Sequence, residues 1–228
     1  MLIGGLQKTS LIDFPKKIAA IVFTHGCNFR CPYCHNPELV TGGQGDITQE
    51  YVLNFLEKRR GKLDGVVVTG GEPCLQKDLP DFLRILKEMD YAVKLDTNGS
   101  HYKMLKSIID DELTDYIAMD IKAPVEKYET VANTNFNVQN IIKSIDLIMN
   151  SGVDYEFRTT VVKNLLSPQD FDKIGFLADG AEKYFIQNFL YTKTLDKTYS
   201  KAAPFAPSEL KEAAELLKQH NINYVKIR

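Results

Sequence analysis

Short apolar runs alternate along the chain with longer segments in which apolar residues recur at helical spacing. Runs rich in β-branched residues predict strands at residues 19–26, 65–71, 92–99, 116–122, 155–162 and 183–189. Spacings of three and four between apolar positions predict helices at residues 48–60, 78–89, 137–152 and 167–180. Continuous apolar strands that alternate with amphipathic helices indicate a parallel sheet covered by helices.

The ends of the predicted helices carry residues with known capping preferences. Thr48 and Ser167 stand where a side-chain oxygen can accept from the first helical amides, so we expect both to be N-caps. Gly61, Gly152 and Gly180 stand after the last apolar positions of three helices, and we expect them to stop those helices.

The number of strand–helix units narrows the fold class. Six such units fall short of the eight in a full TIM barrel, which takes about 250 residues. We predict an α/β fold, a partial (β/α)6 TIM-like barrel with parallel strands, and short edge strands from residues 4–15 and 222–228. An open doubly wound sheet is the alternative. A chain of 228 residues fits a single domain, residues 1–228, with polar residues gathered at the strand ends.

Composition and charge argue against several classes of function. The formal charge of −2 disfavours nucleic acid or an anionic membrane as the main partner. No run approaches the roughly 18 apolar residues of a membrane span, and the first residues lack the charged leader and apolar run of a signal peptide. Four cysteines in a chain of this length do not resemble a secreted disulfide framework, so we expect reduced thiols and a cytoplasmic location.

Three of the four cysteines, Cys27, Cys31 and Cys34, lie within eight positions in one loop, residues 25–36. Thiolates are soft ligands for zinc, Cu(I) or iron–sulfur clusters. A structural zinc takes four protein ligands, and His35 adjoins Cys34 too closely to complete the set easily. A 4Fe–4S cluster takes one ligand for each iron, so three cysteines would leave one iron open to a small molecule. A zinc site and a free-thiol or disulfide loop remain alternatives.

The segment "CNFRCPYC" at residues 27–34 resembles the CxxxCxΦC signature of the radical S-adenosylmethionine (SAM) superfamily, with Tyr33 at the aromatic position next to SAM. The resemblance implies a partial (β/α)6 barrel, a 4Fe–4S cluster on the three cysteines, and SAM bound to the open iron through its amino and carboxylate groups. It also implies reductive cleavage of SAM to a 5′-deoxyadenosyl radical that abstracts a hydrogen atom. The cluster and SAM carry this chemistry, so we expect no further catalytic side chain.

The segment "TGGEPC" at residues 69–74 resembles the GGE motif of the same superfamily. The resemblance places Gly70, Gly71 and Glu72 at the methionyl amino group of SAM. Glycines permit a close backbone approach, and a carboxylate accepts from an ammonium. A glycine-rich turn between a strand and a helix is the alternative. We interpret Cys74 as a small buried residue and not as a cluster ligand.

The segments "KLDTNG" and "AMDIK" end two predicted strands and resemble segments that face SAM in the glycyl-radical activating subgroup. The resemblance assigns Asp96, Thr97 and Asp120 to SAM and to a monovalent cation near the methionine carboxylate. Lys122 would offset carboxylate charge in the same pocket. Turns with an aspartate cap are the alternative.

Two further segments carry candidate SAM contacts. Arg158 is a charge inside a buried-looking strand and needs a partner, which the SAM carboxylate or ribose, or an internal Asp or Glu, could supply. By resemblance, Gln187 and Asn188 contact adenosine or ribose, with capping of the strand end as the alternative. The backbone at His35 would contact adenine.

Residues 4–40 resemble activating proteins of anaerobic ribonucleotide reductases, and the resemblance extends along the chain. It implies hydrogen abstraction from a glycine of such a reductase or of another glycyl-radical enzyme, with an external reductant such as flavodoxin or ferredoxin. Asp13 resembles an aspartate that docks the substrate peptide in pyruvate formate-lyase activase, although residues 14–16 depart from that motif. Action on a small molecule or ribosomal peptide, as in carboxy-deazaguanine synthase, and a non-enzymatic zinc or iron–sulfur module stay open.

Overall fold

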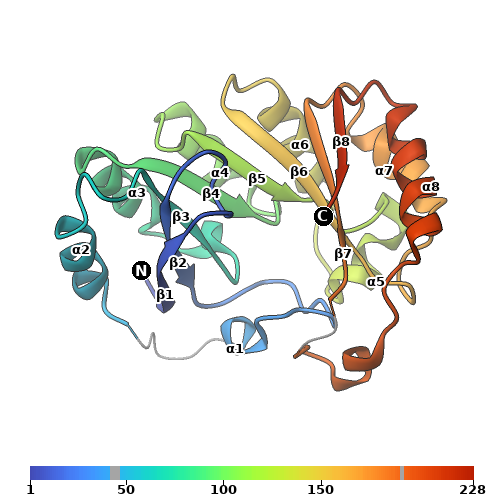
Figure 1. Cartoon of the computed structure of the whole chain (residues 1–228), viewed down its shortest axis with the longest axis horizontal. Coiled ribbons are helices and arrows are strands. Elements are labelled where there is room, and N and C mark those ends of the chain that lie inside the picture. Colours follow the sequence, from blue (N-terminus) through green and yellow to red (C-terminus); the bar gives the residue numbers. More distant parts are fainter. Residues whose placement is uncertain (42–46, 191–192) are drawn as a thin grey trace. The chain divides into compact units, whose positions relative to one another are not determined.

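The computed structural model describes residues 1–41, 47–190 and 193–228. The chain divides into two compact units, and each unit contains strands and helices (Figure 1). The first unit comprises Met1–Asn28, Glu38–Thr97 and Lys103–Ile117. The second unit comprises Phe29–Pro37, Asn98–Tyr102 and Ala118–Arg228. The predicted α/β class is confirmed, and the assignment of one domain stays a prediction.

Parallel strands form the centre of the first unit. The described strands follow one another in chain order: β1 (Ile3–Ser10), β2 (Ala19–Thr24), β3 (Gly65–Gly70) and β4 (Ala92–Thr97). β1 is antiparallel to β2, whereas β2, β3 and β4 are parallel. Helical segments in this part of the chain are α1 (Pro37–Val40), α2 (Gln49–Glu57), η1 (Pro73–Leu75), α3 (Leu79–Glu88) and α4 (Tyr102–Asp110). The register aligns Thr24 with Gly70, so β2 and β3 end at the same level.

The second unit repeats the parallel arrangement. After β5 (Tyr116–Asp120), its strands are β6 (Asp154–Val161), β7 (Lys183–Asn188) and β8 (Tyr224–Ile227). β6 is parallel to β7, and β7 is parallel to β8. Helical segments are η2 (Val125–Lys127), α5 (Tyr128–Ala132), α6 (Gln139–Met149), α7 (Asp170–Leu177), η3 (Lys197–Lys201) and α8 (Pro207–Lys218). α7 packs against α8, and α8 packs against β8 (Figure 1).

Helix α3 shows how the apolar spacing builds the core of the first unit. Leu79, Phe82, Leu83 and Leu86 are fully buried. Their spacing of three and four residues places them on one helical face. Burial of four such side chains contributes roughly 6–12 kcal/mol before conformational entropy is counted. The opposite face carries Arg84, which is about half exposed and forms an ion pair with an exposed aspartate.

The predicted N-caps have different outcomes. Thr48 is confirmed, because its hydroxyl oxygen accepts from the Tyr51 amide at 3.1 Å at the start of α2. The prediction for Ser167 is wrong, because α7 begins at Asp170 with Gln169 as its N-cap residue. The amide and hydroxyl of Ser167 donate to the Asp170 carboxylate at 2.7 and 3.1 Å, which closes a turn before the helix.

The predicted helix stops are also wrong in position. α2, α6 and α7 are capped at Lys58, Asn150 and Ala178, before the glycines are reached. Gly61, Gly152 and Gly180 instead take left-handed φ values of 70°, 75° and 80° in the turns that follow. Such φ values favour residues without a Cβ, so the glycines shape the turns after the helices and do not form the last hydrogen bonds of the helices.

The bounds of the six predicted strands are confirmed to within two residues at each end, and those of the four predicted helices to within three residues. The predicted edge strands are confirmed as β1 and β8, although residues 11–15 form turns after β1. In the described part of the chain, no helix combines the length and the apolarity needed to cross a membrane.

Candidate cofactor site

The segment after β3 packs tightly against the start of the cysteine loop in the first unit. The Gly71 amide donates to the Thr24 carbonyl at 3.0 Å, and the Glu72 amide donates to the Gly26 carbonyl at 2.9 Å. A Cβ on Gly71 would lie 2.1 Å from the Gly26 carbonyl oxygen, and one on Gly70, whose φ is +122°, would lie 2.3 Å from the Thr24 nitrogen. Both glycines are therefore required sterically, and they fix Gly26 next to Cys27.

Glu72 is a fully buried carboxylate in the same unit. One of its oxygens accepts from the Thr97 hydroxyl at 2.7 Å and from the Cys74 amide at 3.0 Å. Cys74 is 2% exposed, and its sulfur lies 3.6 Å from the Thr97 hydroxyl oxygen. Burial, with the Glu72 charge adding to it, raises the pKa of the Cys74 thiol well above its ordinary value. Cys74 is therefore the small buried residue that the sequence suggested, and Thr97 orients Glu72.

The three loop cysteines differ in burial. Cys31 is buried, whereas Cys27 and Cys34 are half-buried, and all are free thiols. The Cys34 amide donates to the Cys31 carbonyl at 3.0 Å, so these two belong to one turn of the second unit. Burial raises the pKa of the Cys31 thiol. Among the described residues, no three His, Cys, Asp or Glu side chains form a group that could hold a metal ion, so the ligand set stays a prediction.

Later residues of the second unit hold this turn. The Leu195 amide donates to the Cys34 carbonyl at 3.1 Å, and the Asp196 amide donates to the Pro32 carbonyl at 2.9 Å. The ring of His35 stacks on Phe189, with centroids 5.2 Å apart and planes 16° from parallel. Burial lowers the pKa of His35. The loop conformation thus depends on residues far along the chain.

Tyr33 has a buried hydroxyl without a hydrogen-bond partner among the described residues. Its side chain is 4% exposed, so bulk water does not satisfy the hydroxyl. Burial, reinforced by the charge of Cys31, raises the pKa of Tyr33 well above its ordinary value. A buried polar atom left unpaired is rare and indicates a missing partner, such as a polar atom of a bound molecule.

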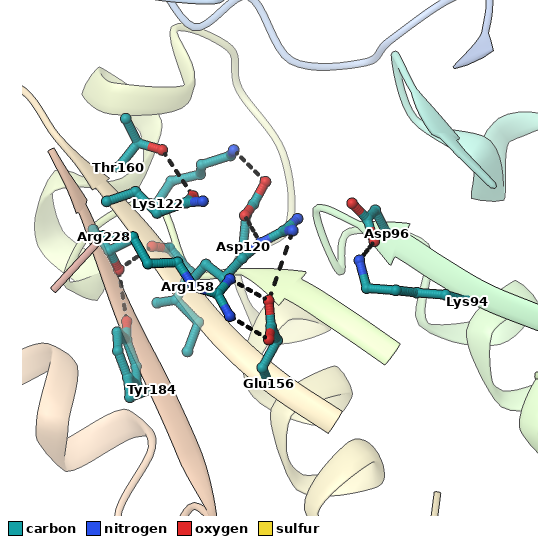
Figure 2. Close-up of polar contacts among 12 residues, drawn as sticks. Lys94, Asp96, Asp120, Lys122, Glu156, Arg158, Thr160, Tyr184 and Arg228 are labelled. Carbon is teal, nitrogen blue, oxygen red and sulfur yellow. Dashed lines mark hydrogen bonds and ion pairs between the residues drawn. The ribbon is translucent and has the colours of Figure 1, made fainter. Parts of the chain in front are cut away.

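A charge network joins β5 and β6 in the second unit (Figure 2). The two carboxylate oxygens of Asp120 bind the Lys122 ammonium and the Arg158 Nε, each at 2.9 Å. Burial alone would raise the pKa of Asp120, but Arg158 and Lys122 hold it well below its ordinary value. Burial would likewise lower the pKa of Lys122, and the Asp120 charge raises it well above normal. The partner that Arg158 requires is thus an internal carboxylate, and Lys122 offsets its charge.

The network continues to two residues that the sequence analysis missed (Figure 2). Arg228 donates to both oxygens of Glu156, at 3.0 and 3.1 Å, and Arg158 lies 4.0 Å from the same carboxylate. The Glu156 side chain is only 3% exposed. The Arg228 guanidinium also lies 3.3 Å from the centroid of the Phe185 ring. An acidic residue two positions before Arg158, in an apolar strand, is the sequence signal that could have revealed Glu156.

The contacts at the end of β7 support capping of the strand end by Asn188, one of the two residues predicted there to contact SAM. The Asn188 side chain accepts from the Phe205 amide at 3.0 Å and donates to the Phe205 carbonyl at 3.1 Å. Gln187 accepts from the Thr160 hydroxyl at 3.4 Å and stays half-buried. Their contacts with adenosine or ribose stay predictions.

Two other candidates are held by local contacts in the first unit. The Lys94 ammonium binds Asp96, and Lys94 is 2% exposed (Figure 2). Lys94 was not among the predicted site residues, although a lysine inside a buried run is itself unusual. The hydroxyl of Ser10 donates to the Asp13 carboxylate, which closes the turn after β1. The monovalent cation and peptide docking by Asp13 stay predictions.

The chain matches known proteins over most of its length. The model of the "Radical SAM superfamily" matches residues 21–175. "Putative glycyl-radical enzyme activating enzyme MJ1227" of Methanocaldococcus jannaschii is 33% identical over 229 residues, which cover 98% of this chain and 95% of that protein. A "Pyruvate formate-lyase-activating enzyme" of Clostridium pasteurianum is 35% identical over 127 residues, 53% of this chain and 52% of that protein.

A solved structure supports the same fold at low sequence identity. Streptococcus suis SuiB, crystallised with the precursor peptide SuiA, matches with a TM-score of 0.68 and 13% identity. The match covers 90% of this chain but 47% of SuiB, so the chain spans about half of that protein. The likeness shows the fold alone, and it is consistent with the α/β partial barrel expected of the superfamily.

The donors of this chain fit the cofactors of that superfamily, a 4Fe–4S cluster and SAM. The four cysteines are free thiols, and thiolates are the ligands that iron–sulfur clusters take. The unpartnered Tyr33 hydroxyl and the buried Glu72 carboxylate are polar groups suited to a bound ligand. The superfamily model covers more than half of the sequence, and the Methanocaldococcus relative matches nearly end to end. The chain belongs to the radical SAM superfamily of enzymes.

Proposed function

We propose that this enzyme activates a glycyl-radical enzyme by abstracting a hydrogen atom from one of its glycines. The single observation that carries the proposal is the similarity to the Methanocaldococcus activating enzyme over 98% of this chain and 95% of that protein. The partner proposed is an anaerobic ribonucleotide reductase, with flavodoxin or ferredoxin as the reductant in the cytoplasm. The similarity to a pyruvate formate-lyase-activating enzyme over about half of each chain supports the class of partner.

In this proposal, Cys27, Cys31 and Cys34 hold the cluster and leave one iron for SAM. When bound there, the cluster would supply the electron for reductive cleavage of SAM. The protein must bind SAM in one orientation and exclude water and oxygen, since radicals react with both. The half-buried thiols of Cys27 and Cys34 are accessible to incoming iron, whereas Cys31 must lose its proton in a buried environment.

Glu72 is the proposed acceptor for the methionyl ammonium. Thr97 and the Cys74 amide both bind the same oxygen of Glu72, at 2.7 and 3.0 Å, and so fix the rotamer of the carboxylate. A buried carboxylate in a fixed rotamer can bind an ammonium strongly, because charge-assisted hydrogen bonds are about twice as strong as neutral ones.

Arg158 is the proposed donor to the carboxylate or ribose of SAM. Asp120 binds its Nε at 2.9 Å, and this contact orients the guanidinium. Glu156, which binds Arg228, lies 4.0 Å from Nη1 of the same guanidinium (Figure 2). Tyr33, with its unpartnered hydroxyl, is the proposed polar contact to adenosine.

The experiment is anaerobic reconstitution of the full chain followed by reaction with SAM, a reductant and a candidate glycyl-radical enzyme. We expect 5′-deoxyadenosine and methionine as products and a glycyl-radical EPR signal on the partner. Deuterium at the α-carbon of the partner's glycine should appear in 5′-deoxyadenosine. Cys34→Ser should abolish both products, whereas Cys74→Ser should retain the cluster. Deuterium transfer from a small molecule, with none from any glycyl-radical enzyme, would overturn the proposal.

A further inference from the structure

The Lys94 ammonium is a buried positive charge on the strand that ends at Asp96 and Thr97. Lys94 is 2% exposed, and its neighbours Val93 and Leu95 are fully buried. Residues i and i+2 of a strand lie on the same face, so the side chains of Lys94 and Asp96 are neighbours on one face of β4. The ammonium binds the Asp96 carboxylate, as Figure 2 shows, and lies 6.0 Å from the centroid of the Tyr116 ring. A carboxylate and a π-face together define a site for a cation.

This ammonium retains unused hydrogen-bonding capacity. A lysine ammonium has three N–H donors, and Asp96 is its one hydrogen-bond partner among the described residues. A buried charge with unused donors is costly unless a ligand or an ordered water accepts from it. The side chain therefore has donors available for an anionic group of a bound molecule.

The carboxylates that resemblance assigns to a monovalent cation already have internal cations. Asp96 binds Lys94, and the two oxygens of Asp120 bind Lys122 and Arg158. The Thr97 hydroxyl donates to the Glu72 carboxylate, so its hydrogen points toward Glu72. An added metal ion at Asp96 would lie beside the Lys94 ammonium, and two like charges at that separation repel each other strongly in a buried site.

We infer that Lys94 supplies, as part of the chain, the positive charge that would otherwise come from a bound Na⁺ or K⁺, and that its ammonium binds the carboxylate of SAM. The inference rests on SAM binding, which the family provides, and not on the identity of the glycyl-radical partner. It predicts that this enzyme binds SAM equally well with or without small monovalent cations.

The test measures the Kd of SAM for the cluster-loaded full chain in sodium, potassium and tetramethylammonium chloride at equal ionic strength. We expect the wild-type Kd to agree within about twofold in the three salts. Lys94→Met should weaken SAM binding by about tenfold or more in tetramethylammonium, since a charge-assisted bond is lost. Sodium or potassium should restore a part of that loss, because the vacated site next to Asp96 can then accept an ion.

Lys106→Met is the matched control, because Lys106 forms an ion pair with Asp110 on the surface of α4. It should leave the Kd and its salt response unchanged. A wild-type Kd that depends on sodium or potassium would overturn the inference, as would unchanged SAM binding or absent rescue in folded Lys94→Met. If the methionine variant does not fold, Lys94→Gln and the wild-type salt series decide. The readout is binding, so failure here is distinct from failure to activate a partner.

Discussion

Arg228 and Glu156 offer a direct test of how a buried charge pair stabilises the second unit. Replacing Arg228 by Gln removes two charge-assisted hydrogen bonds, at 3.0 and 3.1 Å, from a carboxylate that is 3% exposed. It also removes the guanidinium from the face of Phe185. Arg158 stays near Glu156, with its Nη1 4.0 Å from the carboxylate.

The magnitude follows from the burial of the two partners. Breaking a fully buried ion pair costs about 3–5 kcal/mol, because the remaining charge is left without compensation. The Arg228 side chain is 39% exposed and Arg158 remains nearby, so we expect a smaller loss. We place the loss at about 2–3 kcal/mol in the free energy of unfolding, a lowering of Tm by about 4–12 °C in a chain of this size.

The assay is reversible denaturant unfolding of the reduced full chain, followed by circular dichroism, with thermal melts alongside. Arg60→Gln is the control, because the Arg60–Glu57 pair is about half exposed and should contribute less than about 1 kcal/mol. The double variant Arg228→Gln/Glu156→Gln should recover part of the loss, since no buried charge is then stranded. A loss below about 0.5 kcal/mol for Arg228→Gln would refute the reasoning, which rests on the cost of removing two charge-assisted hydrogen bonds from a buried carboxylate.

Three further predictions concern the candidate site. Gly71→Ala should destabilise the fold by about 1–3 kcal/mol and weaken SAM binding in calorimetry, because its Cβ would lie 2.1 Å from the Gly26 carbonyl oxygen; unaltered binding would contradict this packing. Arg158 and Lys122 hold the pKa of Asp120 below its ordinary value, so the ionised carboxylate stabilises the folded chain fully above the pKa of the unfolded state, near 4. This stabilisation is lost as the pH falls toward the pKa of the folded state. Asp120→Asn should therefore be less stable at neutral pH and show a shallower acid limb in melts between pH 3 and 7; parallel profiles would count against the ion pairs. In metal-free protein, iodoacetamide should alkylate Cys34 well before Cys74, whose thiol is 2% exposed with a raised pKa; mass mapping that gives the reverse order would disprove the burial assignment.

The sequence predicted the features whose determinants are contiguous. The strands were found because each apolar run is uninterrupted, and Thr48 was found because an N-cap acts within three residues. The glycines after β3 were found because the motif is contiguous, and their packing on Gly26 explains why glycine stands there.

Other features depend on residues that are distant in the chain. Arg228 pairs with Glu156 because β8 and β6 both flank β7, a register that no local pattern encodes. Ser167 failed as a cap because Asp170 accepts both of its donors and sets the start of the helix. Lys94 was overlooked because a single polar residue in an apolar run is usually taken as an interruption of the strand pattern. In the structure it forms an ion pair with Asp96, two residues further along the same strand.

The turn that contains Cys31 and Cys34 is held by the amides of Leu195 and Asp196, which are synthesised more than 150 residues later. A ribosome-bound nascent chain therefore exposes the cysteines long before the backbone partners of their turn exist. Iron and sulfide delivered at that stage would meet a loop that is free to bind metals in several arrangements. Cluster insertion in the cell should accordingly follow the synthesis and folding of residues 195 and 196, and truncation before residue 195 should yield protein that takes up iron poorly.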